Sequence, residues 1–176
     1  MNNFRKFDQL RTTELQVLRK GFFNPTYILT DGQFDYAQLN CISAFKREKN
    51  IETAEGSYLI KPIGWLAKET QIIDNARGEI IGSIKKNGWD TKVALEMSNG
   101  FNAFLKRGPG FFSRELIWVN DQYGDAIKIK ACYKWHTSFK ISYDPSIMKT
   151  TFPLALITLV GVNIILIRQA QAAAAV

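Results

Sequence analysis

The 176 residues suit a single domain, and a content of 46% hydrophobic and 12% aromatic residues is ample for a packed core. This composition excludes a chain that is disordered throughout. The formal net charge of +7 favours anionic partners such as phospholipid headgroups or nucleic acid, although the same charge also serves solubility.

Two features of the sequence indicate a reducing compartment, and we therefore expect a cytoplasmic protein. Cys41 and Cys132 lie far apart, with no CxxC motif and a single histidine in the chain, so they are expected to be free thiols rather than a disulfide or a zinc site. Charged residues interrupt every apolar run in residues 1–20, which excludes a secretory signal there.

Residues 1–20 are predicted to be an entry segment with a short helix, ahead of a single domain at 21–176. Thr13 and Gln16 have the spacing of a capping box, and Leu10, Val17 and Leu18 form a small apolar stripe. We expect this stripe to pack against the domain. A helix lying on a membrane surface is the alternative.

Between Tyr27 and Tyr143, turn signals recur about every ten residues. Asp-Gly and Asn-Gly pairs supply the positive φ values that tight hairpins require, and the segments between them are rich in β-branched and aromatic residues. No long helical pattern separates these segments, so the crossovers of a parallel sheet are absent. The pattern predicts a mainly β protein, an antiparallel sandwich or barrel. The turn signals are Asp31-Gly32, Glu55-Gly56, residues 75–78, Asn87-Gly88, Asn99-Gly100, residues 108–110 and residues 121–124.

The clearest alternation of apolar and polar residues runs from Ile127 to Ser142. Odd positions are mostly apolar and even positions mostly polar, which predicts a sheet with one dry and one wet face. Sixteen residues are long for one strand, so we expect a bend or a turn near 134–136.

Residues 150–167 are uncharged and rich in Leu, Ile and Val, and Pro153 stands where the first turn of a helix tolerates it. A helix that is apolar on every side must be surrounded by protein or by lipid. It is either the plug of a closed barrel or a membrane anchor at the short end of the spanning length. Asn163 is costly in lipid but could form a hydrogen bond to an inward-facing group of a barrel.

Hairpins with Asp-rich turns followed by a final apolar helix resemble the tubby-like barrel superfamily, which includes tubby C-terminal domains, phospholipid scramblases and LURP-one-related proteins. The resemblance is carried by residues 73–84, 119–125 and 153–163 and covers about residues 27–169. It implies a closed antiparallel barrel of about twelve strands around a hydrophobic C-terminal helix, here at about 152–169. It also makes phosphoinositide binding an expectation. The chain departs from scramblases in lacking their proline-rich N-terminus and cysteine-rich stretch, which puts lipid scrambling in doubt.

The sequence offers no catalytic constellation, and we expect a protein that is not an enzyme and uses no metal or cofactor. His136 is the only histidine, and no GxSxG or GxxxxGK[ST] motif occurs. Asp74, Asp121 and Asp125 occupy turn positions, where aspartate is favoured for its hydrogen bonds to nearby backbone.

The candidate site is cationic. Lys128, Lys130 and Lys134 fall on one strand face at a period of two, and Lys85 and Lys86 add charge near a predicted turn. Lysine suits phosphate or an anionic membrane surface, while a solvated outer face that discourages edge pairing is the plainer interpretation. Nucleic acid is disfavoured because this outer face lacks aromatic residues for stacking. The leading hypothesis is a binding or scaffold module for anionic phospholipid headgroups. The alternative is a tail-anchored, scramblase-like membrane protein with a cytosolic β domain.

Overall fold

The computed structural model describes residues 4–22, 24–43, 47–64, 68–86, 93–110, 113–132 and 137–174. It consists of twelve strands, two single turns of 3-10 helix at Phe7–Gln9 and Ile147–Lys149, and one α-helix, α1, at Leu154–Ala174. The strands are β1 (Glu14–Lys20), β2 (Thr26–Thr30), β3 (Asp35–Ser43), β4 (Glu48–Thr53), β5 (Ser57–Ile63), β6 (Glu69–Asp74), β7 (Glu79–Lys86), β8 (Val93–Met97), β9 (Asn102–Arg107), β10 (Glu115–Asn120), β11 (Gly124–Ala131) and β12 (Thr137–Tyr143).

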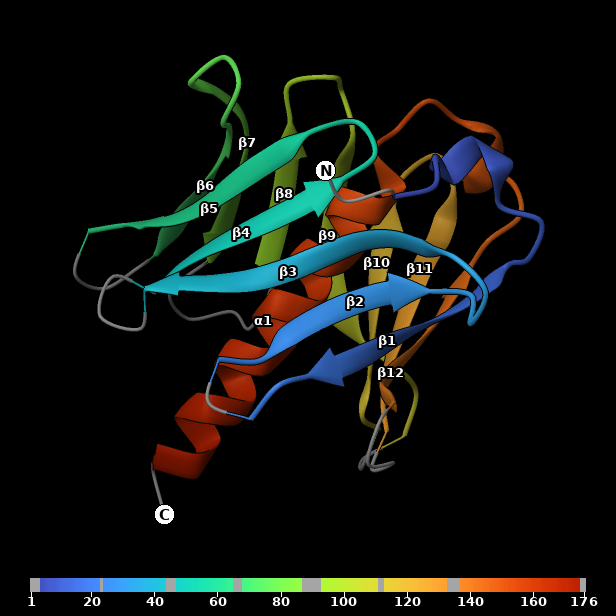
Figure 1. The fold of residues 1–176 in the computed structure, drawn as a ribbon. Coiled ribbons are helices and arrows are strands. Elements are labelled where there is room, and N and C mark those ends of the chain that lie inside the picture. Colours follow the sequence, from blue (N-terminus) through green and yellow to red (C-terminus); the bar gives the residue numbers. More distant parts are fainter. Residues whose placement is uncertain are drawn as a thin grey trace.

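The strands form a closed antiparallel barrel in which each strand pairs with its neighbours in the chain, and β1 pairs with β12 to close the ring (Figure 1). Glu14 pairs with Ser142 and Val17 with Phe139 across this closure. Closure removes the exposed sheet edges that would otherwise recruit other strands. The predicted mainly β fold, a barrel of about twelve strands around a C-terminal helix, is confirmed.

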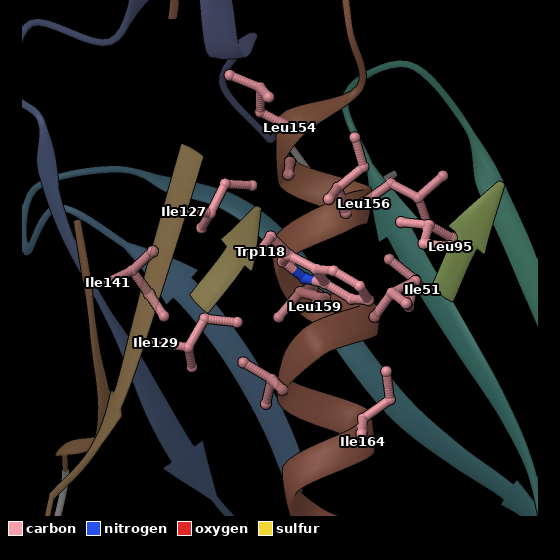
Figure 2. Close-up of a cluster of buried hydrophobic side chains, with 14 of the residues drawn as sticks. Ile51, Leu95, Trp118, Ile127, Ile129, Ile141, Leu154, Leu156, Leu159 and Ile164 are labelled. Carbon is pink, nitrogen blue, oxygen red and sulfur yellow. The ribbon is translucent and has the colours of Figure 1, made fainter. Parts of the chain in front are cut away.

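Helix α1 fills the barrel, as Figure 1 shows by its course through the ring of strands. Every residue from Leu154 to Ile165 is buried. Inward-facing side chains from opposite sides of the barrel pack on the helix, among them Ile51, Leu95 and Trp118 (Figure 2). The side chains of the barrel wall and those of the helix thus form one hydrophobic core, because neither surface could remain in water alone.

The predicted turns are formed where the structure describes them. The Oδ1 of Asp31 accepts hydrogen bonds from the backbone N–H groups of Gln33 and Phe34, at 2.8 and 2.7 Å. The Oδ1 of Asn120 accepts from Gln122 and Tyr123 in the same way, and Gly124 follows with φ of +62°. Asp74 accepts from the N–H of Ala76. Asp74 therefore has the turn role expected of it, whereas Asp125 lies on β11 and forms an ion pair with Lys106 at 2.6 Å. Asn87-Gly88 lies outside the described residues.

The expected alternation from Ile127 to Ser142 is confirmed as two strands with a shared buried face. Ile129 pairs with Ile141 across β11 and β12, and both side chains are buried. The strands end and begin at Ala131 and Thr137, so the expected break falls between them. Of the predicted bend, Lys134 and His136 lie outside the described residues.

The helix expected at the capping box of Thr13 and Gln16 is wrong, and the barrel begins earlier than residue 21. Glu14–Lys20 is strand β1, with Leu15 and Val17 buried two residues apart. The short helix of this segment is instead the 3-10 turn Phe7–Gln9. A capping box is a local preference, and here the hydrogen bonds offered by both β2 and β12 outweigh it.

The barrel has two ends of different character. Because neighbouring strands are antiparallel, every second connection lies at the same end. The five connections that follow the even-numbered strands β2 to β10 form what we call the hairpin end. The six that follow the odd-numbered strands form the other end, where the last turns of α1 project beyond the strands (Figure 1), and which we call the mouth.

Candidate functional site: the mouth of the barrel

The structure does not bring the predicted lysines together. Lys128 and Lys130 are on β11, whereas Lys85 and Lys86 are on β7, with three strands between them around the barrel. Lys134 lies outside the described residues. The four described lysines therefore do not form one anion-binding surface.

Lys128 and Lys130 line a shallow hollow on the outer face of the barrel, as the predicted polar face requires. Lys140 is the partner of Lys130 across β11 and β12 and completes a basic cluster. Three carboxylates, those of Glu14, Asp31 and Glu115, line the same hollow. Their negative charge offsets the lysines, which makes this face a weak attractor for an anion.

Lys85 and Lys86 point in opposite directions, as neighbours on a strand must. The Nζ of Lys85 donates to Oε2 of Glu96 at 2.6 Å on the outer surface, so its charge is paired. Lys86 is half-buried at the mouth. Burial lowers the pKa of Lys86, and the nearby guanidinium groups of Arg168 and Arg47 lower it further. Lys86 thus belongs to a concentration of positive charge.

This concentration runs around the mouth. In the described parts of the mouth connections the charged residues are Arg47, Lys68 and Arg114, all of them basic. Burial lowers the pKa of Arg168, and the positive charge of Arg107 lowers it further. We call this set the basic rim: Lys20, Arg47, Lys68, Lys86, Arg107, Arg114 and Arg168. The acidic residues at the same level are Glu48, Glu69 and Glu115, the first residues of their strands.

The hairpin end has the opposite balance. Its five connections contain Asp31, Glu55 and Asp121 and a single basic residue, Arg77. Asp74 and Asp144 lie directly beside that end, at or just after the last residue of a strand. The N-terminal segment and the residues after β12 also lie at this end, and they add Arg5, Lys6, Arg11 and Lys149 together with Asp8. With the first residues of the strands, Glu14, Asp35 and Glu79, acidic residues still outnumber basic ones there. The barrel is therefore electrically polar along its axis, positive at the mouth and negative at the hairpin end.

Large apolar side chains are exposed among the rim cations. Phe22 is 82% exposed, Ile42 57% and Ile63 37%. Phe22 lies just after β1, Ile42 is the last residue but one of β3, and Ile63 is the last residue of β5, so all three are at the mouth. The last turns of α1, from Ala170 to Ala174, are also exposed and consist mostly of alanine. An end of a protein that combines cations, apolar tips and an apolar helix end has the composition of a surface that contacts lipid.

An apolar groove opens beside the helix at this mouth. Its volume is about 440 Å³, and it lies between the outer half of α1 and strands β2 to β4. Leu166, Ile167 and Ala170 form its helical wall. Tyr27, Leu39 and Cys41 line the barrel side, and Arg47, Lys49 and Asn163 contribute polar groups. The Nζ of Lys49 donates to the Sγ of Cys41 at 2.9 Å.

Within the described residues, no three His, Cys, Asp or Glu side chains are grouped to hold a metal ion. Cys41 and Cys132 are both free thiols and half-buried. Helix α1 is long and apolar enough to cross a membrane by length and composition alone, and 67% of its most apolar window is buried inside the protein. A core helix meets that test as well, so the observation is weak evidence for a span.

Comparison with family models, with curated proteins and with solved structures finds no match for this chain.

Sequence reasoning found Lys86 of the rim but missed the rim as a whole and the groove. The signal was present in the turns, because alternate turns of a meander share one end. Asp31-Gly32 and Asn99-Gly100 fall in connections of the hairpin end, and Arg47, Lys68 and Arg114 fall in connections of the mouth, although Asn87-Gly88, between β7 and β8, departs from this alternation. The groove gave no comparable signal. Its residues come from β2, β3 and β4 on one side and from α1 on the other, and α1 begins about a hundred residues after β4.

Proposed function

We propose that this protein is a non-enzymatic binding module of the tubby-like kind, which docks on anionic phospholipid surfaces through the mouth of its barrel. The observation that carries the proposal is the combination of the basic rim with the exposed side chains of Phe22, Ile42 and Ile63 at one end of the molecule. The helix-filled barrel is the fold that the resemblance to tubby-like proteins implies, which supports the same class.

The orientation follows from the axial charge polarity. With the mouth on the bilayer, the rim cations meet the headgroups and the acidic hairpin end points away, so attraction and repulsion both favour this pose. Each basic residue near an anionic surface contributes about 1 kcal/mol. Exposed apolar tips add binding that does not depend on salt, because they enter the boundary between headgroups and chains.

The experiment compares two charge reversals on the full chain. Lys68→Glu with Arg107→Glu alters the rim, and Lys128→Glu with Lys130→Glu alters the outer face by the same four units of net charge. Cosedimentation with vesicles containing phosphatidylserine is the measurement, with neutral phosphatidylcholine vesicles for comparison. We expect the rim variant to bind at least tenfold more weakly and the outer-face variant to bind nearly as well as the parent.

Three outcomes would contradict the proposal. Equal losses in both variants would mean that only net charge matters, and a loss confined to the outer-face variant would place the site on β11. Binding that is equal for neutral vesicles and insensitive to salt would remove the anionic headgroup from the interaction. Resistance of the cellular protein to alkaline carbonate extraction would instead favour the tail-anchored alternative.

A further inference from the structure

The wall of the groove beside α1 contains a buried side-chain amide whose oxygen has no hydrogen-bond partner in the described residues. Asn163 is 2% exposed and lines the groove, and its Oδ1 forms no hydrogen bond within the described residues. A buried polar group without a partner destabilises the fold, so such an atom calls for an explanation. As placed, this oxygen needs a donor. After a half-turn of the amide, the Nδ2 donor takes its position, and an acceptor oxygen of a ligand in the groove could then supply the partner that the protein does not.

The charge of the groove restricts what that ligand can be. Lys49 follows the inward-facing alternation of β4, in which Ile51 and Thr53 are buried, and it lines the groove together with Arg47. No Asp or Glu is found among the described lining residues. A cation that points inward and has no carboxylate beside it favours an anionic group.

The remaining wall is apolar and elongated. From Asn163 to Ala174 the helix advances about 16 Å along the groove, and the side chains that it presents there are Leu166, Ile167, Ala170, Gln171 and Ala174. The volume of about 440 Å³ is within the range of small-molecule sites. An apolar groove beside a helix, with Lys49 and Asn163 among its lining, fits a molecule that has one apolar chain and one charged head.

We propose that this groove binds a single-chain anionic amphiphile, with Lys49 and Asn163 holding its head and the helix face of Leu166, Ile167 and Ala170 covering its chain. The Asn163 amide can accept from a hydroxyl or, after a half-turn, donate to a carboxylate or phosphate oxygen. The chain covers the part of α1 that the strands leave half-buried. This binding does not depend on membrane docking and can fail or hold separately from it.

Cys41 provides a direct readout, because it lines the groove whereas Cys132, at the end of β11, does not. The full chain is treated with a thiol reagent with and without oleate below its micellar concentration, and the two thiols are quantified separately by mass spectrometry. We expect oleate to slow modification of Cys41 at least tenfold and to leave Cys132 unchanged. Equal protection of both thiols would indicate a general detergent effect and would overturn the proposal.

Two variants test the head site by calorimetric titration with oleate. Lys49→Gln and Asn163→Leu should each bind oleate at least fivefold more weakly, while Lys128→Gln serves as a matched surface control and should match the parent. Calorimetry is required here because Lys49 contacts Cys41 directly and its loss alters the thiol as well. Affinities of both groove variants within twofold of the parent would overturn the assignment, and a thermal melt confirms that each variant is folded.

Further titrations test whether the head of the ligand must be charged, whether it is a carboxylate or a phosphate, and whether binding in the groove is independent of vesicle binding. Oleyl alcohol, which is neutral, should bind at least tenfold more weakly than oleate, and equal binding would remove the anionic head from the proposal. Lysophosphatidate tests a phosphate head, and tighter binding than oleate would identify a lysophospholipid. The rim variant Lys68→Glu with Arg107→Glu should lose vesicle binding yet keep oleate protection of Cys41, because neither residue lines the groove.

Discussion

The hydroxyl oxygens of Tyr143 and Thr158 lie 2.7 Å apart in a buried hydrogen bond that joins strand β12 to helix α1. Burial raises the pKa of the Tyr143 hydroxyl far above its ordinary value, and the bond to Thr158 lowers it only in part. The tyrosine therefore stays neutral, and the pair is a polar contact between the barrel wall and the helix that restricts the height and rotation of the helix inside a mostly apolar core.

Loss of this hydrogen bond should destabilise the protein, whether Tyr143 or Thr158 is substituted. Tyr143→Phe and Thr158→Val each remove one hydroxyl and leave the other buried without this partner, so each should lower the free energy of unfolding by about 1–2 kcal/mol. Urea denaturation measures the effect. The double variant should lose clearly less than the sum of the two. Additive losses would show that the two hydroxyls are not coupled.

Gly161 should not tolerate a methyl group, although alanine is the better helix former. A Cβ at this position would clash with Cδ1 of Ile129 and would lie 2.6 Å from the indole Nε1 of Trp118, and both side chains pack beside the helix (Figure 2). The end of the Ile129 side chain can turn away, whereas the rigid indole ring cannot. Overpacking costs about 1–3 kcal/mol, whereas alanine gains at most about 1 kcal/mol in helix propensity. We therefore expect Gly161→Ala to lower the urea midpoint.

The rescue for that substitution is Trp118→Phe. The smaller ring makes room for the methyl group and also removes an indole N–H that has no hydrogen-bond partner in the described structure. In the background of Trp118→Phe, the further change Gly161→Ala should cost less than it does in the parent chain. A larger cost would contradict the close approach of the two residues.

Removal of the helix should abolish folding. The helix buries eight large aliphatic side chains, and each contributes about 1.5–3 kcal/mol, so their sum matches or exceeds the total stability of a typical domain. They are Leu154, Leu156, Ile157, Leu159, Val160, Val162, Ile164 and Ile165. Circular dichroism with a thermal melt compares residues 1–149 with the full chain in the absence of detergent.

We expect a cooperative melt only for the full chain. A well-folded 1–149 fragment, together with a full chain that requires detergent, would contradict the role of α1 as core and would favour a membrane anchor.

Stability should fall as pH rises above about 10. The pKa of Tyr36 is raised to about 12, first by burial and then by its hydrogen bond to Asp31, at 2.7 Å. Because the pKa of Tyr36 is higher in the folded protein than in the unfolded chain, its contribution to the free energy of unfolding is complete below about pH 10. That contribution is lost between about pH 10 and 12. Burial raises the pKa of Tyr27, Tyr58 and Tyr143 as well, so the losses reinforce each other.

Urea titrations at pH 8, 10 and 11 measure this slope. Tyr36→Phe is the control, because it removes one of the titrating groups and should flatten the decline. A decline that is equally steep in the variant would show that Tyr36 does not contribute to it.

Much of the fold could be predicted from local patterns, because they report on local geometry. The turn pairs at Asp31-Gly32 and Asn99-Gly100 require positive φ, and the alternation around Ile129 requires a strand with one buried face. The uniform apolarity of residues 150–167 required that the helix be surrounded on all sides. It could not say whether by protein or by lipid, and the barrel around Leu154–Ile165 decided that.

The candidate site could not be predicted in this way, because it depends on which residues from distant parts of the sequence come into contact in the fold. Lys128 and Lys130 are neighbours on a strand and were visible in the sequence, but the carboxylates of Glu14 and Glu115 that share their hollow come from other strands. The sequence by itself indicated a mainly β chain, the inward face of β11 and β12 and an apolar C-terminal helix, through propensity and periodicity, but it did not indicate strand β1. Only closure of the barrel gathered Arg47, Lys86, Arg107 and Arg168 at one mouth and left Asn163 beside an open groove, because contacts between distant segments are set by topology.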